Sequence, residues 1–125
     1  NPLSAHKSLR FLNSLASLGF EVWGVWGDML ELGSITSQAH QEFLRELKES
    51  SLSRALLVGE EMKKAAEAIA KKEIQEGRFL LFSTSPEAQE FLAHHPPRGK
   101  QWAILFKGSR KVELERAIPP EWREQ

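Results

Sequence analysis

Two kinds of apolar segment alternate along the chain, and this alternation limits its fold more than any other feature. Four short runs rich in Val, Leu, Phe and Trp lie at residues 20–26, 54–58, 79–83 and 102–106. Such runs are typical of strands that are buried on both faces. The segments between them carry apolar residues three or four positions apart, which predicts amphipathic helices. Because strands that alternate with helices form parallel βαβ units, we predict an α/β three-layer fold with a mostly parallel sheet of at least four strands.

The ends of the helices follow from residues that start or stop helices. We expect helices over residues 4–18, 37–49, 60–72, 85 to about 95, and about 109–118. Gly19 can adopt the left-handed conformation that ends the first helix. Ser85-Pro86-Glu87 combines a cap residue, a proline in the first turn and an acid near the positive end of the helix dipole. Three tryptophans in the predicted strands are expected to be core residues: Trp23, Trp26 and Trp102.

The composition excludes several classes of protein. The length of 125 residues fits one domain. The 17 Lys and Arg residues balance the 17 Asp and Glu residues, so the chain lacks the excess positive charge that nucleic-acid binding needs. The absence of cysteine excludes disulfides, thiol catalysis and Cys-based zinc sites, and no apolar run approaches the roughly 20 residues of a membrane helix. We therefore expect a cytoplasmic domain that binds no nucleic acid and has no membrane span.

The loops that follow the four strands are the expected place for a ligand, because parallel α/β sheets bind ligands beyond the carboxyl ends of their strands. The fourth loop is Lys107-Gly108-Ser109-Arg110. Its glycine permits a tight turn, and the backbone N–H groups at the start of a helix favour an anion. Lys107 and Arg110 add positive charge, and Arg can hold a carboxylate through two hydrogen bonds. The residue types leave open whether this loop binds an anion or is an ordinary solvated turn.

The first of these loops contains Asp28, within "GDMLELG". Its carboxylate could take an ammonium group, or it could cap a helix or turn. His40 is expected to be a surface or capping residue, and the adjacent His94 and His95 diverge by roughly 100° on a helix, which is unsuitable for joint metal binding. No phosphate-binding loop, dinucleotide motif, zinc-protease motif or nucleophile elbow is present. The residues alone therefore indicate an α/β domain with a charged ligand edge, no metal site and no catalytic constellation.

Four segments in one order carry a resemblance to a known family. They are "NPLS" at the start of a helix, "VWGDMLELG" before the helix with His40, "LLVGE", and "ILFKGSR" followed by "LE". This series resembles the C-terminal domain of the Mur ligases of the MurF type, the UDP-N-acetylmuramoyl-tripeptide:D-alanyl-D-alanine ligases, from residue 1 to about residue 117. The resemblance implies a Rossmann-like domain over residues 1–125 that binds the amino component and forms part of a three-domain enzyme.

The resemblance also implies a reaction and its partners. ATP phosphorylates the carboxylate of a UDP-N-acetylmuramoyl tripeptide, and the amine of D-alanyl-D-alanine then attacks the acyl phosphate. ATP and Mg²⁺ would be bound mainly by a central ATPase domain of the same chain, which agrees with the missing phosphate-binding loop. The resemblance thus implies that residues 1–125 contain no catalytic residue and are inactive on their own.

The resemblance also implies which substrate these loops bind. Lys107, Ser109 and Arg110 would bind the carboxylate of the dipeptide. Asp28 would attract its ammonium end, and Asn1 would lie near the nucleotide. Trp26 departs from the family pattern, which has a smaller aliphatic residue before "GD".

Two other classes of function stay open at this point. A receiver-like phosphoacceptor domain would use Asp28, Ser83 or Thr84, and Lys107 at its strand tips. Against it, the acidic pair that would hold Mg²⁺ early in the chain is missing, and Lys107 is followed by Gly-Ser where that family usually has Pro. The third class is a structural interaction module in which the charged turn is unused.

Overall fold

Four parallel strands form a sheet in the order β3-β2-β1-β4. The structure is a computed structural model, and it describes residues 1–99, 101–108 and 114–122, without the side chains of residues 114 and 115. Its strands are β1 (Glu21–Gly27), β2 (Arg54–Val58), β3 (Phe79–Phe82) and β4 (Trp102–Lys107). Its helices are α1 (Pro2–Ser17), α2 (Thr36–Glu49), α3 (Glu60–Ile69), α4 (Lys71–Gln75) and α5 (Ser85–His94). Short 3₁₀ segments are η1 (Gly33–Ile35), η3 (Leu114–Ala117) and η4 (Pro120–Trp122).

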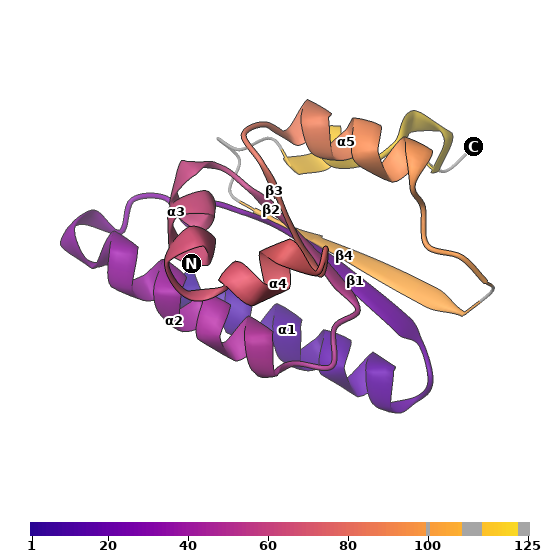
Figure 1. The fold of residues 1–125 in the computed structure, drawn as a ribbon, viewed down its shortest axis with the longest axis horizontal. Helices are drawn as coiled ribbons and strands as arrows, with labels where there is room; N and C mark the ends of the chain where they lie inside the picture. Colours follow the sequence, from indigo (N-terminus) through magenta and orange to yellow (C-terminus); the bar gives the residue numbers. More distant parts are fainter. Residues whose placement is uncertain (100, 109–113, 123–125) are drawn as a thin grey trace.

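The helices cover both faces of the sheet (Figure 1), as the alternation predicted. Helices α1 to α4 lie on one face, and α5 lies on the other together with η3, which packs against it. Side chains of β1 enter both layers: Trp26 is buried among α1 and α2, and Trp23, three residues before it, is buried beneath α5. The predicted three-layer α/β fold is confirmed, as are all four predicted parallel strands.

The order of the strands determines where a crevice can form. The chain moves from β1 to β2 and β3 in one direction, and then crosses back to place β4 on the other side of β1. The loops that follow β1 and β4 therefore leave the sheet in different directions, which opens a crevice at the carboxyl ends of these two strands. In the register of this pair, Trp26 lies opposite Lys107.

The predicted helix over residues 60–72 is wrong in one respect, because it is two helices. The helix is interrupted at Ala70, whose φ of −132° and ψ of 38° are not helical. Ala70 is fully buried, and the break lets both Ile69 and Ile74 pack against the core. The break exposes the carbonyl of Ile69, which accepts a hydrogen bond of 2.8 Å from Lys48 Nζ. A contact between distant segments, and not the local helical pattern, thus stabilises this boundary.

Three other local predictions also need correction. The part of the last predicted helix that the structure describes, residues 114–117, is a 3₁₀ segment, and residues 109–113 lie outside the described residues. Trp102 is 37% exposed and is not a core residue, because β4 is an edge strand. Its ring lies against that of Trp122, with 5.7 Å between centroids. The helix cap before α5 is Thr84 rather than Ser85.

Candidate functional site at the carboxyl edge of the sheet

A cavity of about 110 Å³ lies at the crevice between β1 and β4. Three of the five predicted site residues line it together: Asn1, Asp28 and Lys107. The remainder of the lining is mostly apolar and includes Trp26, Met29, Leu30 and Met62. The other two predicted site residues, Ser109 and Arg110, lie outside the described residues. The fold thus brings together every predicted site residue that the structure describes, although Asn1 and Lys107 lie at opposite ends of the sequence.

Asp28 follows β1 and caps a helix from a distance. Its two carboxylate oxygens accept hydrogen bonds from the backbone N–H groups of Glu61, at 3.2 Å, and Met62, at 2.9 Å. These N–H groups belong to the first turn of α3, which has no side-chain cap of its own. A carboxylate is favoured there by the free N–H groups and by the helix dipole. The helix-capping interpretation of Asp28 is therefore confirmed, and its role toward a substrate stays a prediction.

Gly59 is the residue that lets Asp28 reach this helix. It stands between β2 and α3 with φ of 116° and ψ of 164°, a conformation that essentially only glycine adopts. A Cβ at this position would lie 2.4 Å from Cγ of Asp28. Gly59 lies in the segment "LLVGE" that contributes to the resemblance, but no role was predicted for it. The signal was a glycine placed directly between an apolar run and an acidic helix start, "VGEE".

His40 holds the loop that carries Asp28, and the prediction of a surface or capping role for it is wrong. The side chain is completely buried. Its Nε2 accepts the N–H of Met29 at 3.0 Å, so Nδ1 carries the hydrogen and donates to the carbonyl of Thr36 at 2.7 Å. Both ring nitrogens are thereby used, which fixes one tautomer and ties the residue after Asp28 to α2. The available signal was the position of His40 on the apolar face of its helix, beside Ala39 and Phe43.

The electrostatics of the cavity favour an anion beside β4. Lys107 is the last residue of β4, and its ammonium group makes no hydrogen bond or ion pair with any described residue. Asn1 caps α1 by accepting the N–H of Ser4 at 2.8 Å, so the positive end of this 16-residue helix also faces the cavity. The carboxylate of Asp28 accepts two N–H groups of α3, which stabilise its negative charge. One available cation and one helix terminus therefore stand beside a carboxylate that is held in place.

A second cavity, of about 400 Å³, lies on the other side of Asp28. Its lining comes from the loops after β1, β2 and β3, with Ser83 and Thr84, and from Arg116 of η3. Arg116 is not one of the predicted site residues. Lys107 lines only the first cavity, and Ser83 and Thr84 line only the second. A receiver-like domain would need Asp28, Ser83 or Thr84, and Lys107 around one cavity. The fold does not bring these residues together in this way.

Two other kinds of feature are absent from the described residues. No three His, Asp or Glu side chains in this part of the chain lie close enough together to hold a metal ion. Among the helices that the structure describes, none combines the length and the apolar character needed to cross a membrane.

Comparison with known proteins gives both a family and a set of similar structures. The sequence model of the family described as "Mur ligase, glutamate ligase domain" matches residues 1–110. A search of curated protein sequences found no match. A crystal structure of MurF from Acinetobacter baumannii aligns with 94% of this chain at 28% identity and a TM-score of 0.72. The structure of MurF ligase from Thermotoga maritima in complex with ADP aligns with 94% of it at 27% identity and a TM-score of 0.65.

A third solved structure is that of UDP-N-acetylmuramoylalanyl-D-glutamyl-2,6-diaminopimelate–D-alanyl-D-alanyl ligase from Acinetobacter baumannii, which aligns with 94% of this chain at 28% identity and a TM-score of 0.66. The chain spans about a quarter of the length of these ligases, namely 25%, 23% and 24%. The family match covers most of the chain, and the similar structures agree with it over nearly the whole fold. The chain therefore belongs to the Mur ligase family, as a C-terminal domain of the MurF type.

Proposed function

We propose that residues 1–125 are the amino-component-binding domain of a cytoplasmic, ATP-dependent ligase that makes a peptidoglycan precursor. In this proposal the enzyme joins D-alanyl-D-alanine to a UDP-N-acetylmuramoyl tripeptide through an acyl phosphate. The family match and the MurF neighbours support it, and one of those neighbours is itself named as a D-alanyl-D-alanyl ligase. The observation that carries the proposal is the cavity between β1 and β4 that Asp28 and Lys107 share.

The charges of this cavity suit the two ends of a dipeptide. D-alanyl-D-alanine has one carboxylate and one amine. Lys107, the N-terminus of α1 and the neighbouring Ser109 and Arg110 would bind the carboxylate, since charge-assisted hydrogen bonds to an anion are the strongest that such a loop can make. Asp28 would orient the ammonium end before the amine loses its proton and attacks. Its orientation is already set by α3, so binding would require little reorganisation of this side chain.

In this proposal the nucleotide is bound mainly outside residues 1–125. The sequence contains no phosphate-binding loop, and no cluster of three acidic or histidine side chains occurs in the described residues. The described residues thus offer no such site, and we assign ATP and Mg²⁺ mainly to a central ATPase domain of the same enzyme. Asn1 is proposed to lie beside the nucleotide when the domains close. The catalytic steps are likewise assigned outside these residues, so the isolated chain is expected to give no turnover.

The test of the proposal is steady-state kinetics of the full-length enzyme with Lys107→Ala and Arg110→Ala. Each change removes a cation from the proposed carboxylate site. A charge-assisted hydrogen bond contributes roughly 1.5–3 kcal/mol, so kcat/KM for the dipeptide should fall about tenfold to a hundredfold while the KM for ATP changes little. Arg110→Lys should restore only part of the loss, because a point charge cannot replace two parallel hydrogen bonds.

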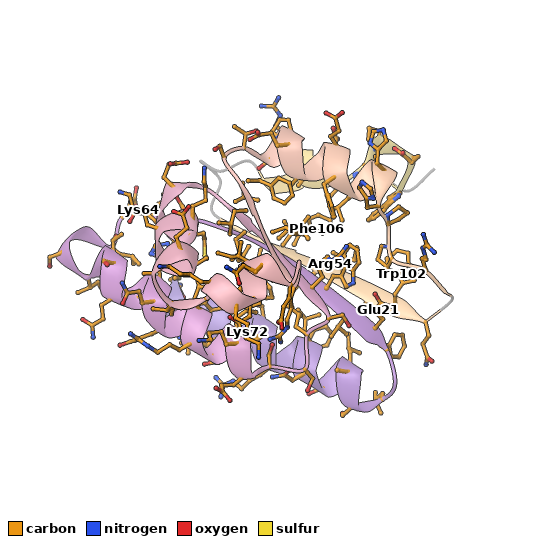
Figure 2. The ribbon with its side chains drawn as sticks, in the orientation of Figure 1. Glu21, Arg54, Lys64, Lys72, Trp102 and Phe106 are labelled. Carbon is orange, nitrogen blue, oxygen red and sulfur yellow. The ribbon has the colours of Figure 1, made fainter. Side chains whose placement is uncertain are left out.

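Matched controls are available on helices remote from the cavity. Lys72 on α4 (Figure 2) and Arg45 on α2 are exposed and do not line it. Alanine at either position should leave both substrates unaffected. If Lys107→Ala and Arg110→Ala leave kcat/KM for the dipeptide unchanged, the proposed carboxylate site is wrong. The assignment of the chain to the Mur ligase family would still stand.

Asp28→Asn is expected to act on stability as well as on the substrate. An Asn side chain can accept one of the two N–H groups of α3, but its own NH₂ group must then face the other. We expect the free energy of unfolding to fall by about 1–2 kcal/mol, as for other lost caps. Urea denaturation measures this change, and it must be known before a change in dipeptide kinetics is ascribed to lost charge. A variant as stable as the parent chain would contradict the capping geometry.

A further inference from the structure

A cavity of about 500 Å³ lies at the opposite edge of the sheet from the proposed dipeptide site. Its walls come from the amino ends of β1 and β2, from the last residue of α5 and from residues 95–98 after it. Figure 2 shows Glu21 and Arg54 at this end of the sheet. Its volume is in the range of sites for small ligands. Neither the family resemblance nor the proposed function uses any residue of this cavity.

Arg54 is held in the cavity by aromatic rings and not by a carboxylate. Its guanidinium carbon lies 5.0 Å from the centre of the Trp23 ring and 5.7 Å from that of Phe91. Within the part of the chain that the structure describes, the guanidinium group makes no hydrogen bond or ion pair. Its five N–H donors therefore remain available to a ligand. Two flanking rings also limit the motion of the side chain, which lowers the entropic cost of binding an anion.

Among the described residues of the lining, the one acidic side chain has a different partner. Glu21 accepts a hydrogen bond of 2.8 Å from the indole N–H of Trp23, and it forms no ion pair with Arg54. Arg98, an exposed residue, supplies a second cation to the cavity. His95 is also in the lining, with its ring stacked on that of Phe91 at a centroid distance of 4.9 Å. The lining thus contains two arginines and one carboxylate that is already hydrogen-bonded.

We propose that this cavity is a second ligand site, and that it binds a small oxyanion, a phosphate or carboxylate group, through Arg54 and Arg98. Arg suits such groups because its planar fork can donate two parallel hydrogen bonds to one oxyanion. Trp23 forms an apolar wall against which the rest of the ligand can pack. Because the cavity is at the far edge of the sheet, its ligand would leave the cavity between β1 and β4 open to its own substrate.

The test is a titration of the 125-residue chain with sodium phosphate, sodium pyrophosphate and sodium citrate, at constant ionic strength set by NaCl. The indole N–H of Trp23 and the side-chain N–H of Arg54 provide NMR signals inside the cavity. We expect saturable shifts of these signals with at least one of the three anions. Saturation by the phosphates alone identifies a phosphoryl ligand, saturation by citrate alone identifies a carboxylate ligand, and saturation by both identifies a general oxyanion site.

The variants separate a specific site from general charge attraction. Arg54→Gln should weaken binding about tenfold or more, and Arg54→Lys should weaken it less, because the charge remains. Arg98→Gln, at an exposed position, should weaken binding measurably and serves if Arg54→Gln does not fold. Arg45→Gln removes the same charge from the opposite layer and should change affinity less than about twofold. Absence of saturation with all three anions, or an equal loss in Arg45→Gln and Arg54→Gln, would overturn the proposal.

Discussion

Gly59→Ala is expected to lower the free energy of unfolding by roughly 3–5 kcal/mol, measured by urea denaturation. An alanine at φ of 116° and ψ of 164° would occupy a region that costs about 1–3 kcal/mol. Its methyl group would also lie 2.4 Å from Cγ of Asp28. The carboxylate cannot move away without breaking its hydrogen bonds to Glu61 and Met62, and the loss of such bonds to an ionised group costs about 1.5–3 kcal/mol.

Gly77→Ala is the matched control for Gly59→Ala. Gly77 also has positive φ, 78°, but nothing lies within 4 Å of the position that a Cβ would take. Its substitution should cost only the backbone strain, about 1–2 kcal/mol. The difference between the two variants measures the contact with Asp28. Equal losses in both would show that the carboxylate moves without penalty, and that Gly59 serves only its own backbone conformation.

Gly24→Ala should be the second most damaging substitution, with a loss of about 3 kcal/mol from overpacking. A Cβ on Gly24 would lie 2.1 Å from Cη2 of Trp26, two residues along the same strand and on the same face. The indole cannot yield, because Nε1 donates to Ser8 Oγ at 3.0 Å and the ring packs edge-on against Phe43 at a centroid distance of 5.2 Å. Trp26 is also 1% exposed, so the ring cannot turn out into solvent without disrupting the core.

A double-mutant cycle tests the explanation for Gly24. In a Trp26→Val background the obstacle is gone, and an alanine in a strand is no worse than a glycine. Gly24→Ala should then cost less than about 1 kcal/mol, which gives a coupling of about 2 kcal/mol between the two positions. Thermal or urea unfolding of the four proteins provides the measurement. The same cost in both backgrounds would mean that some other contact limits the size of residue 24.

This pair also explains how the domain accommodates a side chain as large as Trp26, at the position where the resemblance implies a smaller aliphatic residue. The large ring lies over the backbone of Gly24, and the missing side chain there provides the space. Neither residue alone indicates this arrangement. It becomes evident only when the strand places residues i and i+2 on the same face.

The sequence by itself determined the type, number and direction of the strands that the structure describes. Apolar runs and helical spacing are local properties, and they are visible in any window of the chain. The same holds for the loops of the site: Asp28 and Lys107 could be assigned to one edge because all parallel strands end there. The resemblance rested on short motifs in the same loops, which is why it identified the family that residues 1–110 match.

The tertiary structure alone decided which loops meet and what each side chain does. The order β3-β2-β1-β4 placed Lys107 beside Asp28 and left Ser83 on the far side of it. The hydrogen-bond partners of Asp28 lie 33 and 34 residues away, and the carbonyl of Ile69, exposed by the helix break at Ala70, bonds to a lysine 21 residues away. The burial of His40 and the exposure of Trp102 depend on neighbours contributed by other elements. No local pattern encodes these outcomes, because each is a contact between segments that only the folded chain brings together.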